Sequence, residues 1–457
     1  QYGFVYYPIF KFLDGDIVAF RQINYCITIL FTFILIFSSI RYLSKNKIIS
    51  NSSNSILSFG LSVCLGVLFN DWLITPNYNI LVFQGLLIFL IGLNINIFDQ
   101  KKRWLGLLLI SLGGFVIFLG KPTSAIMLAV IFFILFFKQL TINKIASLII
   151  FLLAISTLFL FLIDHGFIEF YNRMHYASSL YELTEHNLIK KILLNFIDSP
   201  FDYKGEGIYY LIIIILLMFL CSFWEKININ KFYSLSISVF FVFAVIFLIL
   251  HPIQIEFNKY LLWILICIPI ASFLYVFYIE IVSPYTKPIF LKYTNENKKL
   301  IALYILSPFI LVFGTNTNPY TSVSQYSFIW IISSLFIILP ASNKKLDCDE
   351  LIPLVMASQI LYLLIISLHI ISPYRQDQPL FKNNMKFYIK DEDYLILSDE
   401  RFNFFTKVRE IFKSQGLFNK ISIIDLTGMS PGLIYLVGGK SIGSPWINGG
   451  SAYHSIE

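Results

Sequence analysis

A single lysine interrupts one of the longest apolar stretches of the chain. Lys121 is the one charged residue between positions 105 and 137, and Pro122 follows it directly. A charged side chain in such surroundings is a candidate functional group, because moving a charge out of water is costly. Its ammonium is suited to binding an anion such as a phosphate. The alternative is that Lys121 extends to lipid headgroups at a membrane surface, so its depth decides between the two readings.

Two further segments combine side chains that are able to bind or transform a polar ligand. The sequence "NDWLITPNYN" at 70–79 supplies a possible base (Asp71), an indole that stacks on sugar rings (Trp72), and hydrogen-bonding groups (Asn77, Tyr78, Asn79). An ordinary capped loop with an interfacial tryptophan explains this segment equally well. The sequence "IDHGFIEFYNRMHYAS" offers His165 and Arg173 as sugar or acceptor contacts, although a solvated helix face explains it better.

Metal and cofactor sites are not indicated by the sequence. The histidines and carboxylates at 164–175 lack the spacing of known zinc motifs, and the five cysteines form no metal or disulfide pattern. We therefore predict no metal and no cofactor, with a divalent cation left open. A GxxxxGK phosphate loop is also missing from the sequence, which argues against ATP-driven chemistry.

Composition places these residues in a membrane protein. The chain has 457 residues, of which 57% are hydrophobic and 13% charged, and its mean hydropathy is +0.74. Soluble domains contain about 25% charged residues. The net charge of +7 is carried largely by short loops, so it indicates membrane topology and no nucleic-acid partner.

The apolar segments predict an all-α polytopic fold with about 12 transmembrane helices, because about 20 apolar residues cross a bilayer. The predicted spans are 23–43, 56–74, 80–98, 104–120, 122–137, 145–164, 208–224, 233–250, 260–279, 300–314, 326–341 and 351–372.

Lysine and arginine mark alternate loops between these spans. The basic loops contain Arg41, Lys45, Lys47, Lys101, Lys102, Arg103, Lys138, Lys144, Lys226, Lys231, Lys287, Lys292, Lys298, Lys299, Lys344 and Lys345. The opposite short loops contain only Lys121 and, at an edge, Lys259. Because basic loops stay in the cytoplasm, Lys121 is predicted to lie at the outer face. The chain begins at Gln1 on that face, so we expect a further span upstream.

Three segments are predicted to lie outside the cytoplasm. Residues 1–22 are rich in Tyr and Phe and suit an interfacial helix, and residues 165–207 suit one or two amphipathic helices. Residues 373–457 are predicted to form a small α/β tail, with strands at 394–398 and 421–426, a helix at 400–415 and a short helix near Pro431. The transmembrane domain is predicted to cover residues 23–372.

Four motifs resemble the GT-C-type integral membrane glycosyltransferases. They are "YGFVYYPIF" before the first span, the outer turn "TPNYN", the hairpin "GKPTS" and the tail outside the membrane. The resemblance implies transfer of a sugar from a polyprenyl-phosphate carrier to a glycan, lipid or protein acceptor. It implies an inverting reaction at the outer face of a bacterial inner membrane, in the synthesis or modification of the envelope.

The resemblance also implies roles for particular residues. Members of this superfamily carry an acidic residue in the first outer loop, and this chain begins after the position expected for that loop. Asp71 is then the best remaining catalytic carboxylate, which accepts the acceptor's proton. Lys121, with Arg21 and Lys259 as helpers, is expected to bind the donor phosphate.

Other classes of membrane protein remain open on sequence alone. A transporter or flippase of a lipid-linked or small polar substrate is the main alternative, although such proteins often show mid-span charges and internal repeats. The sequence contains neither. A polymer ligase with a related site, or a structural protein whose tail binds a partner, also fits the topology.

Overall fold

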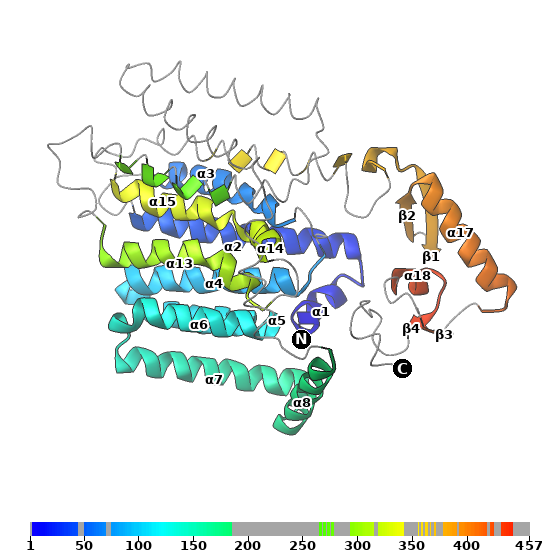
Figure 1. The fold of residues 1–457 in the computed structure, drawn as a ribbon, viewed down its shortest axis with the longest axis horizontal. Coiled ribbons are helices and arrows are strands. Elements are labelled where there is room, and N and C mark those ends of the chain that lie inside the picture. The colour runs from blue at the N-terminus through cyan, green and yellow to red at the C-terminus, as the bar shows by residue number, and fades with distance from the viewer. Residues whose placement is uncertain are drawn as a thin grey trace, which may run out of the picture. The chain divides into compact units, whose positions relative to one another are not determined.

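The computed structural model describes two compact units within this chain. It covers residues 2–43, 50–69, 75–184, 293–314, 319–341, 378–390, 393–417, 421–424 and 431–441, with isolated residues between 265 and 277 and between 355 and 371. The first unit comprises Gln1–His165 and Lys191–Ile366, and the second comprises Gly166–Lys190 and Ser367–Glu457. The described residues are mostly helical (Figure 1).

The first unit is a bundle of apolar helices that lie side by side (Figure 1). After the short helix α1 (Tyr2–Phe12), its described helices are α2 (Ile17–Leu43), α3 (Asn51–Ser62), η1 (Val63–Phe69), α4 (Tyr78–Phe98), η2 (Gln100–Lys102), α5 (Arg103–Gly120), α6 (Pro122–Phe136), η3 (Phe137–Gln139), α7 (Ile142–Asp164), α13 (Asn295–Val312), α14 (Pro319–Tyr326) and α15 (Ile329–Ala341).

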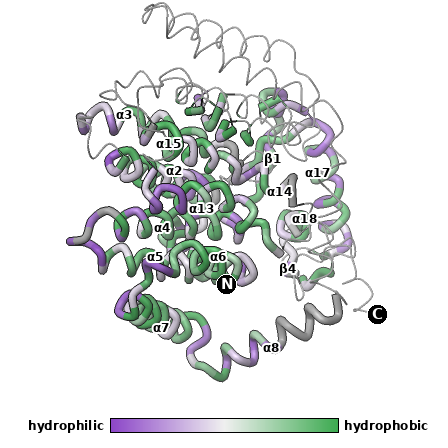
Figure 2. Tube along the Cα trace, turned by 60° about the vertical axis from the view of Figure 1, so that its left-hand side comes forward, coloured by the Kyte–Doolittle hydropathy of each residue, from purple (hydrophilic) through white to green (hydrophobic). Residues whose placement is uncertain are grey.

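Five described helices are long and apolar enough to cross a membrane. They lie at Val18–Leu43, Tyr78–Ile97, Arg103–Gly120, Pro122–Gln139 and Ile142–Asp164. Figure 2 shows the hydrophobic colour along α5, α6 and α7, and hydrophilic residues at the turn between α4 and α5. Length and composition therefore indicate a helical membrane protein.

The predicted count of twelve spans is not reached in the described residues. The predicted spans 208–224 and 233–250 lie outside them, and 260–279 and 351–372 are described only in part. The predicted span 56–74 is wrong as a single helix, because α3 ends at Ser62 and a 3₁₀ segment follows to Phe69. Hydropathy alone does not reveal such a change of helix type. Helix α2 also begins at Ile17, earlier than the predicted start at 23.

Helices α4 and α5 pack backbone against backbone through glycines seven residues apart. A Cβ built on Gly113 of α5 would lie 2.6 Å from the carbonyl oxygen of Gly85 and 2.5 Å from the backbone nitrogen of Phe89 on α4. A Cβ on Gly92 would meet the carbonyl oxygen of Gly106 at 2.8 Å. Small residues permit this close approach between membrane helices, and it fixes α5 rigidly on α4.

Hydrogen bonds connect the ends of helices α2, α6, α7 and α13, and these ends carry basic residues. The hydroxyl of Tyr42 at the end of α2 donates to Asn297 of α13 at 3.3 Å. The side-chain amide of Gln139, which follows α6, donates to Glu296 of α13 at 3.1 Å. The backbone carbonyl of Gln139 accepts from Lys144 Nζ of α7 at 2.8 Å. These ends therefore share one side of the bundle. Their assignment to the cytoplasm remains a prediction.

Buried polar side chains join α1, α2 and α4 inside the apolar bundle. Tyr6 donates to Gln84 at 2.9 Å, and the amide of Gln84 donates to Asn24 at 3.0 Å and to Thr28 at 2.8 Å. Asn24 and Thr28 are 2% and 0% exposed, so the groups satisfy one another within protein. This network holds α1, the predicted interfacial segment, against the bundle.

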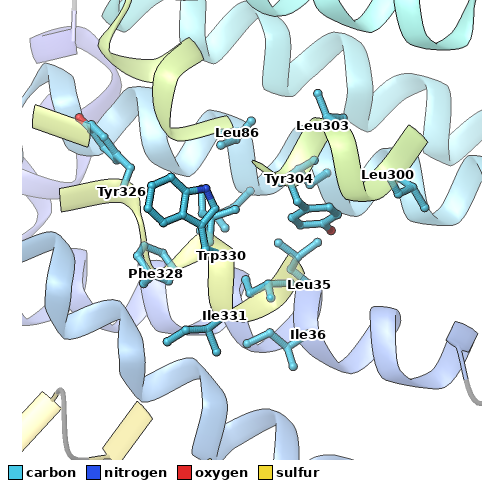
Figure 3. Close-up of a cluster of buried hydrophobic side chains, with 14 of the residues drawn as sticks. Leu35, Ile36, Leu86, Leu300, Leu303, Tyr304, Tyr326, Phe328, Trp330 and Ile331 are labelled. Carbon is cyan, nitrogen blue, oxygen red and sulfur yellow. The ribbon is translucent and has the colours of Figure 1, made fainter. Parts of the chain in front are cut away.

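The main core lies where α2, α4, α13 and α15 meet. Figure 3 shows Trp330 and Ile331 of α15 among Leu35, Leu86 and other core side chains, which are all buried. The indole of Trp330 donates to the backbone carbonyl of Ile305 at 3.0 Å, so its polar atom is satisfied as well.

The second unit contains α8 (Phe167–Thr184) and the described part of the tail. Strands β1 (Met385–Lys390) and β2 (Asp393–Leu397) form an antiparallel hairpin, followed by α17 (Asp399–Ser414), β3 (Ser422–Ile423), α18 (Pro431–Leu436) and β4 (Lys440–Ser441), which pairs parallel to β3. Of the predicted strand 421–426, residues 421–424 are described, and β3 covers 422–423. Arg409 of α17 lies over Phe387 at 4.2 Å and donates to the backbone carbonyls of Tyr388 and Leu436, which fixes α17 on the hairpin.

Candidate functional site

Lys121 forms the whole turn between α5 and α6. Its backbone is extended, with φ −156° and ψ 97°, and it caps both helices. The amide of Lys121 donates to Ile117 at 2.7 Å, and its carbonyl accepts from Ala125 at 3.2 Å. Pro122 occupies the first position of α6, where a missing N–H costs nothing and the fixed φ suits a helix. Pro122 therefore starts a helix here, and no helix is broken.

Three side chains of the "KPTS" sequence donate hydrogen bonds to backbone carbonyls at the C-terminal end of α13. Lys121 Nζ donates to the carbonyl of Leu311 at 3.2 Å, and Ser124 Oγ donates to the same carbonyl at 2.9 Å. Thr123 Oγ1 donates to Phe313 at 2.9 Å. The C-terminus of a helix carries partial negative charge. The ammonium therefore lies where a cation is stabilised, and it is held by a helix 190 positions away in the sequence.

The depth of Lys121 is the decisive observation. Its side chain is 8% exposed, so it lies inside the protein and does not extend to lipid headgroups. Within the described residues no carboxylate forms an ion pair with it, and Leu311 is the hydrogen-bond partner of Nζ. Burial lowers the pKa of this ammonium, which lies between the two spans, to about 7. The remaining N–H donors are suited to an anionic ligand.

Arg21, Asn77, Tyr78 and Asn79 lie at the same end of the bundle as Lys121. Arg21 Nε donates to Thr75 Oγ1 at 2.7 Å, which ties α2 to the start of α4. A Cβ on Gly120 would lie 3.0 Å from the carbonyl oxygen of Tyr78, so the lysine turn sits against the same helix start. Tyr78 is 42% exposed and Asn79 is buried. The structure thus groups these predicted residues at one end of the bundle.

Asn77 has a structural role that competes with the predicted sugar contact. Its side-chain oxygen accepts from Ile80 at 3.0 Å as the N-cap of α4, and its amide donates to the carbonyl of Thr75 at 3.2 Å. We expect Asn77→Ala to lower the free energy of unfolding by about 1 kcal/mol, because a cap is lost. Asn77→Asp is the control, since it preserves the cap. Equal stability of the two variants in a thermal unfolding assay would contradict this role.

Other predicted site residues are not brought to Lys121 by the described structure. His165 ends α7 in a left-handed conformation, with φ 59°, and is exposed. Arg173 belongs to the second unit and lies 5.6 Å from the ring centre of Phe170. Asp71, Trp72 and Lys259 lie outside the described residues, so their roles stay predictions.

One carboxylate at the lysine end is already engaged in helix capping. Asp16 Oδ1 accepts from the amides of Val18 and Ala19 at 2.8 and 3.1 Å, at the first turn of α2. This contact explains an acidic residue before α2 without a catalytic role. Across the described residues, no group of three or more His, Cys, Asp or Glu side chains is placed to hold a metal ion.

Sequence inspection missed the polar groups inside the bundle. Asn24, Thr28 and Thr32 recur every four residues along α2, and all three are buried. This spacing places them on one helix face, and it was available in the sequence as a signal for a hydrogen-bonded helix contact.

The described architecture defines a helical protein with membrane-spanning character and a buried cation at one end of its bundle. In comparisons with known protein families, curated proteins and solved structures, no match to this chain was found.

Proposed function

We propose that this chain is a membrane glycosyltransferase, which moves a sugar from a polyprenyl-phosphate carrier to an acceptor at the extracytoplasmic face. The observation that carries the proposal is the buried ammonium of Lys121, which has no carboxylate partner among the described residues. A buried charge without an opposite charge is costly. The negative charge of a lipid-linked phosphate compensates this cost when the donor binds.

The chemistry assigned to Lys121 is stabilisation of the leaving phosphate. As the bond between the sugar and the phosphate breaks, negative charge grows on the phosphate oxygens. A cation held in place before the reaction stabilises that charge without reorganisation. Leu311 orients the ammonium through its carbonyl, and Arg21 supplies a second cation at the same end of the bundle.

Proton removal from the acceptor requires a carboxylate, and we assign this role to Asp71. In the sequence it lies between η1, which ends at Phe69, and α4, which begins at Tyr78. Tyr78, exposed at the start of α4, is a candidate to hydrogen-bond a sugar hydroxyl. The acceptor is a glycan, a lipid or a protein.

The test is sugar transfer by the purified full-length chain in lipid nanodiscs. We expect consumption of a radiolabelled polyprenyl-phosphate sugar and release of the polyprenyl phosphate. A parallel assay in sealed vesicles measures whether the same lipid crosses the bilayer. Movement of the intact donor without cleavage would favour the flippase alternative and overturn the proposal.

A further inference from the structure

Two polar atoms buried at the junction of α2, α4 and α13 have no hydrogen-bond partner within the described part of the chain. They are Oδ1 of Asn94 and the hydroxyl oxygen of Tyr304. Asn94 is 1% exposed and Tyr304 is 0% exposed. An unpaired carbonyl or hydroxyl in an apolar interior is destabilising, so each such atom in a folded protein requires a physical explanation.

The two described serines beside Asn94 have no proton left for its Oδ1. The amide Nδ2 of Asn94 donates to Ser39 Oγ at 2.9 Å and to Ser38 Oγ at 3.4 Å. Both serine hydroxyls in turn donate to the backbone carbonyl of Leu35, at 2.7 and 2.9 Å. Because each hydroxyl has a single proton, neither serine is able to serve Asn94 Oδ1 as well.

Tyr304 reaches the same cluster from the opposite side. Its hydroxyl lies near Ser39 and Asn94, but no hydrogen bond of acceptable geometry joins it to either residue. Figure 3 shows the Tyr304 ring extending from α13 toward Leu35 and Ile36 of α2. Asn94 Oδ1 therefore needs a donor, and the hydroxyl of Tyr304, which lies close to Asn94, needs a donor and an acceptor.

We propose that a single water molecule binds between Asn94 Oδ1 and the hydroxyl of Tyr304. Water supplies two donors and two acceptors, and buried waters typically join such unsatisfied groups. A metal cation fits this cluster less well, because its described side chains are all neutral and provide no compensating charge. The bound water would link α2, α4 and α13 inside the bundle.

Infrared spectroscopy of the full chain in nanodiscs tests this site. A strongly bound internal water gives an O–H stretching band that shifts when H₂¹⁶O is replaced by H₂¹⁸O. We expect Tyr304→Phe and Asn94→Leu each to lose this band and to lower the unfolding temperature. Tyr293→Phe is the matched control, because the buried hydroxyl of Tyr293 bonds directly to the carbonyl of Ile337. It should lose stability and keep the band.

Three results would overturn the proposal. The first is an isotope-sensitive band that persists in both variants. The second is a higher unfolding temperature for Tyr304→Phe, which would mean that the hydroxyl is unpaired in the wild type. The third is stabilisation by sodium or potassium over choline that disappears in Asn94→Leu, which would assign the site to a cation.

Discussion

Replacing Lys121 with methionine should reduce kcat/KM for a polyprenyl-phosphate sugar by about 100-fold or more, since one preorganised donor to a developing oxyanion contributes an effect of this size. Methionine keeps the length and the apolar stem of lysine and removes its charge. The loss should appear in kcat as well as in KM, because the phosphate gains charge in the transition state. Rates are measured with saturating acceptor in nanodiscs.

The same lysine sets the expected pH dependence. Because burial lowers the pKa of Lys121 to about 7, the free protein loses the positive charge as the pH rises through this value. In the wild type, kcat/KM for the donor should fall about tenfold per pH unit above the pKa. In Lys121→Met it should be low and independent of pH in this range.

The free energy of unfolding should rise with pH over the range in which kcat/KM falls. The folded-state pKa of about 7 lies below the ordinary value of 10.5, so the unfolded chain binds more protons between these two values. The free energy of unfolding of the wild type should therefore rise from pH 7 to 10.5, by about 1.4 kcal/mol per unit at most. A slope that persists in Lys121→Met would show that another group titrates.

The matched control for Lys121 is Lys138→Met. Lys138 is exposed in the short segment after α6, at the other end of that helix. Its replacement should leave transfer of the sugar and its pH profile unchanged. If both lysine variants lost activity equally, a general effect of net charge on donor binding would replace the site assigned to Lys121.

Replacing Gly113 with alanine should destabilise the bundle by about 3 kcal/mol, at the upper end of the usual effect of overpacking. The added Cβ would meet backbone atoms of Gly85 and Phe89 at 2.6 and 2.5 Å. Backbone atoms in a packed helix have no alternative rotamer, so α4 and α5 must separate. Thermal unfolding in detergent or nanodiscs measures the effect.

Gly114 provides a control one position along the same helix. A Cβ on Gly114 would have no atom within 4 Å. Gly114→Ala should therefore raise stability by a few tenths of a kcal/mol to about 1 kcal/mol, because alanine favours a helix over glycine. Equal effects at the two positions would contradict the close packing of α4 and α5.

Much of the bundle could be predicted from hydropathy because the spans are long, apolar and bounded by charge. The predicted spans 80–98, 104–120 and 145–164 agree within a few residues with α4, α5 and α7. The break after Ser62 was missed because both sides of it are apolar. The glycine contacts were missed as well, since seven-residue spacing has meaning only once two helices are known to face each other.

The candidate site was predictable in its chemistry and not in its geometry. Lys121 stands out in the sequence because every neighbour is uncharged. Its depth depends on Leu311, and no local pattern links positions so far apart. For Asn77 the chemistry itself was ambiguous, because asparagine both binds sugars and caps helices. In the structure its side chain caps α4.

The attachment of Lys121, Thr123 and Ser124 to the end of α13 has a mechanical consequence. Because three side chains of one turn are hydrogen-bonded to it, the end of α13 should move together with the ammonium. Any displacement of the C-terminal end of α13 would be transmitted to the charge at the hairpin. At the proposed donor-phosphate site, mutations along the second half of α13, remote in sequence from "KPTS", would then alter phosphate affinity without contacting the phosphate.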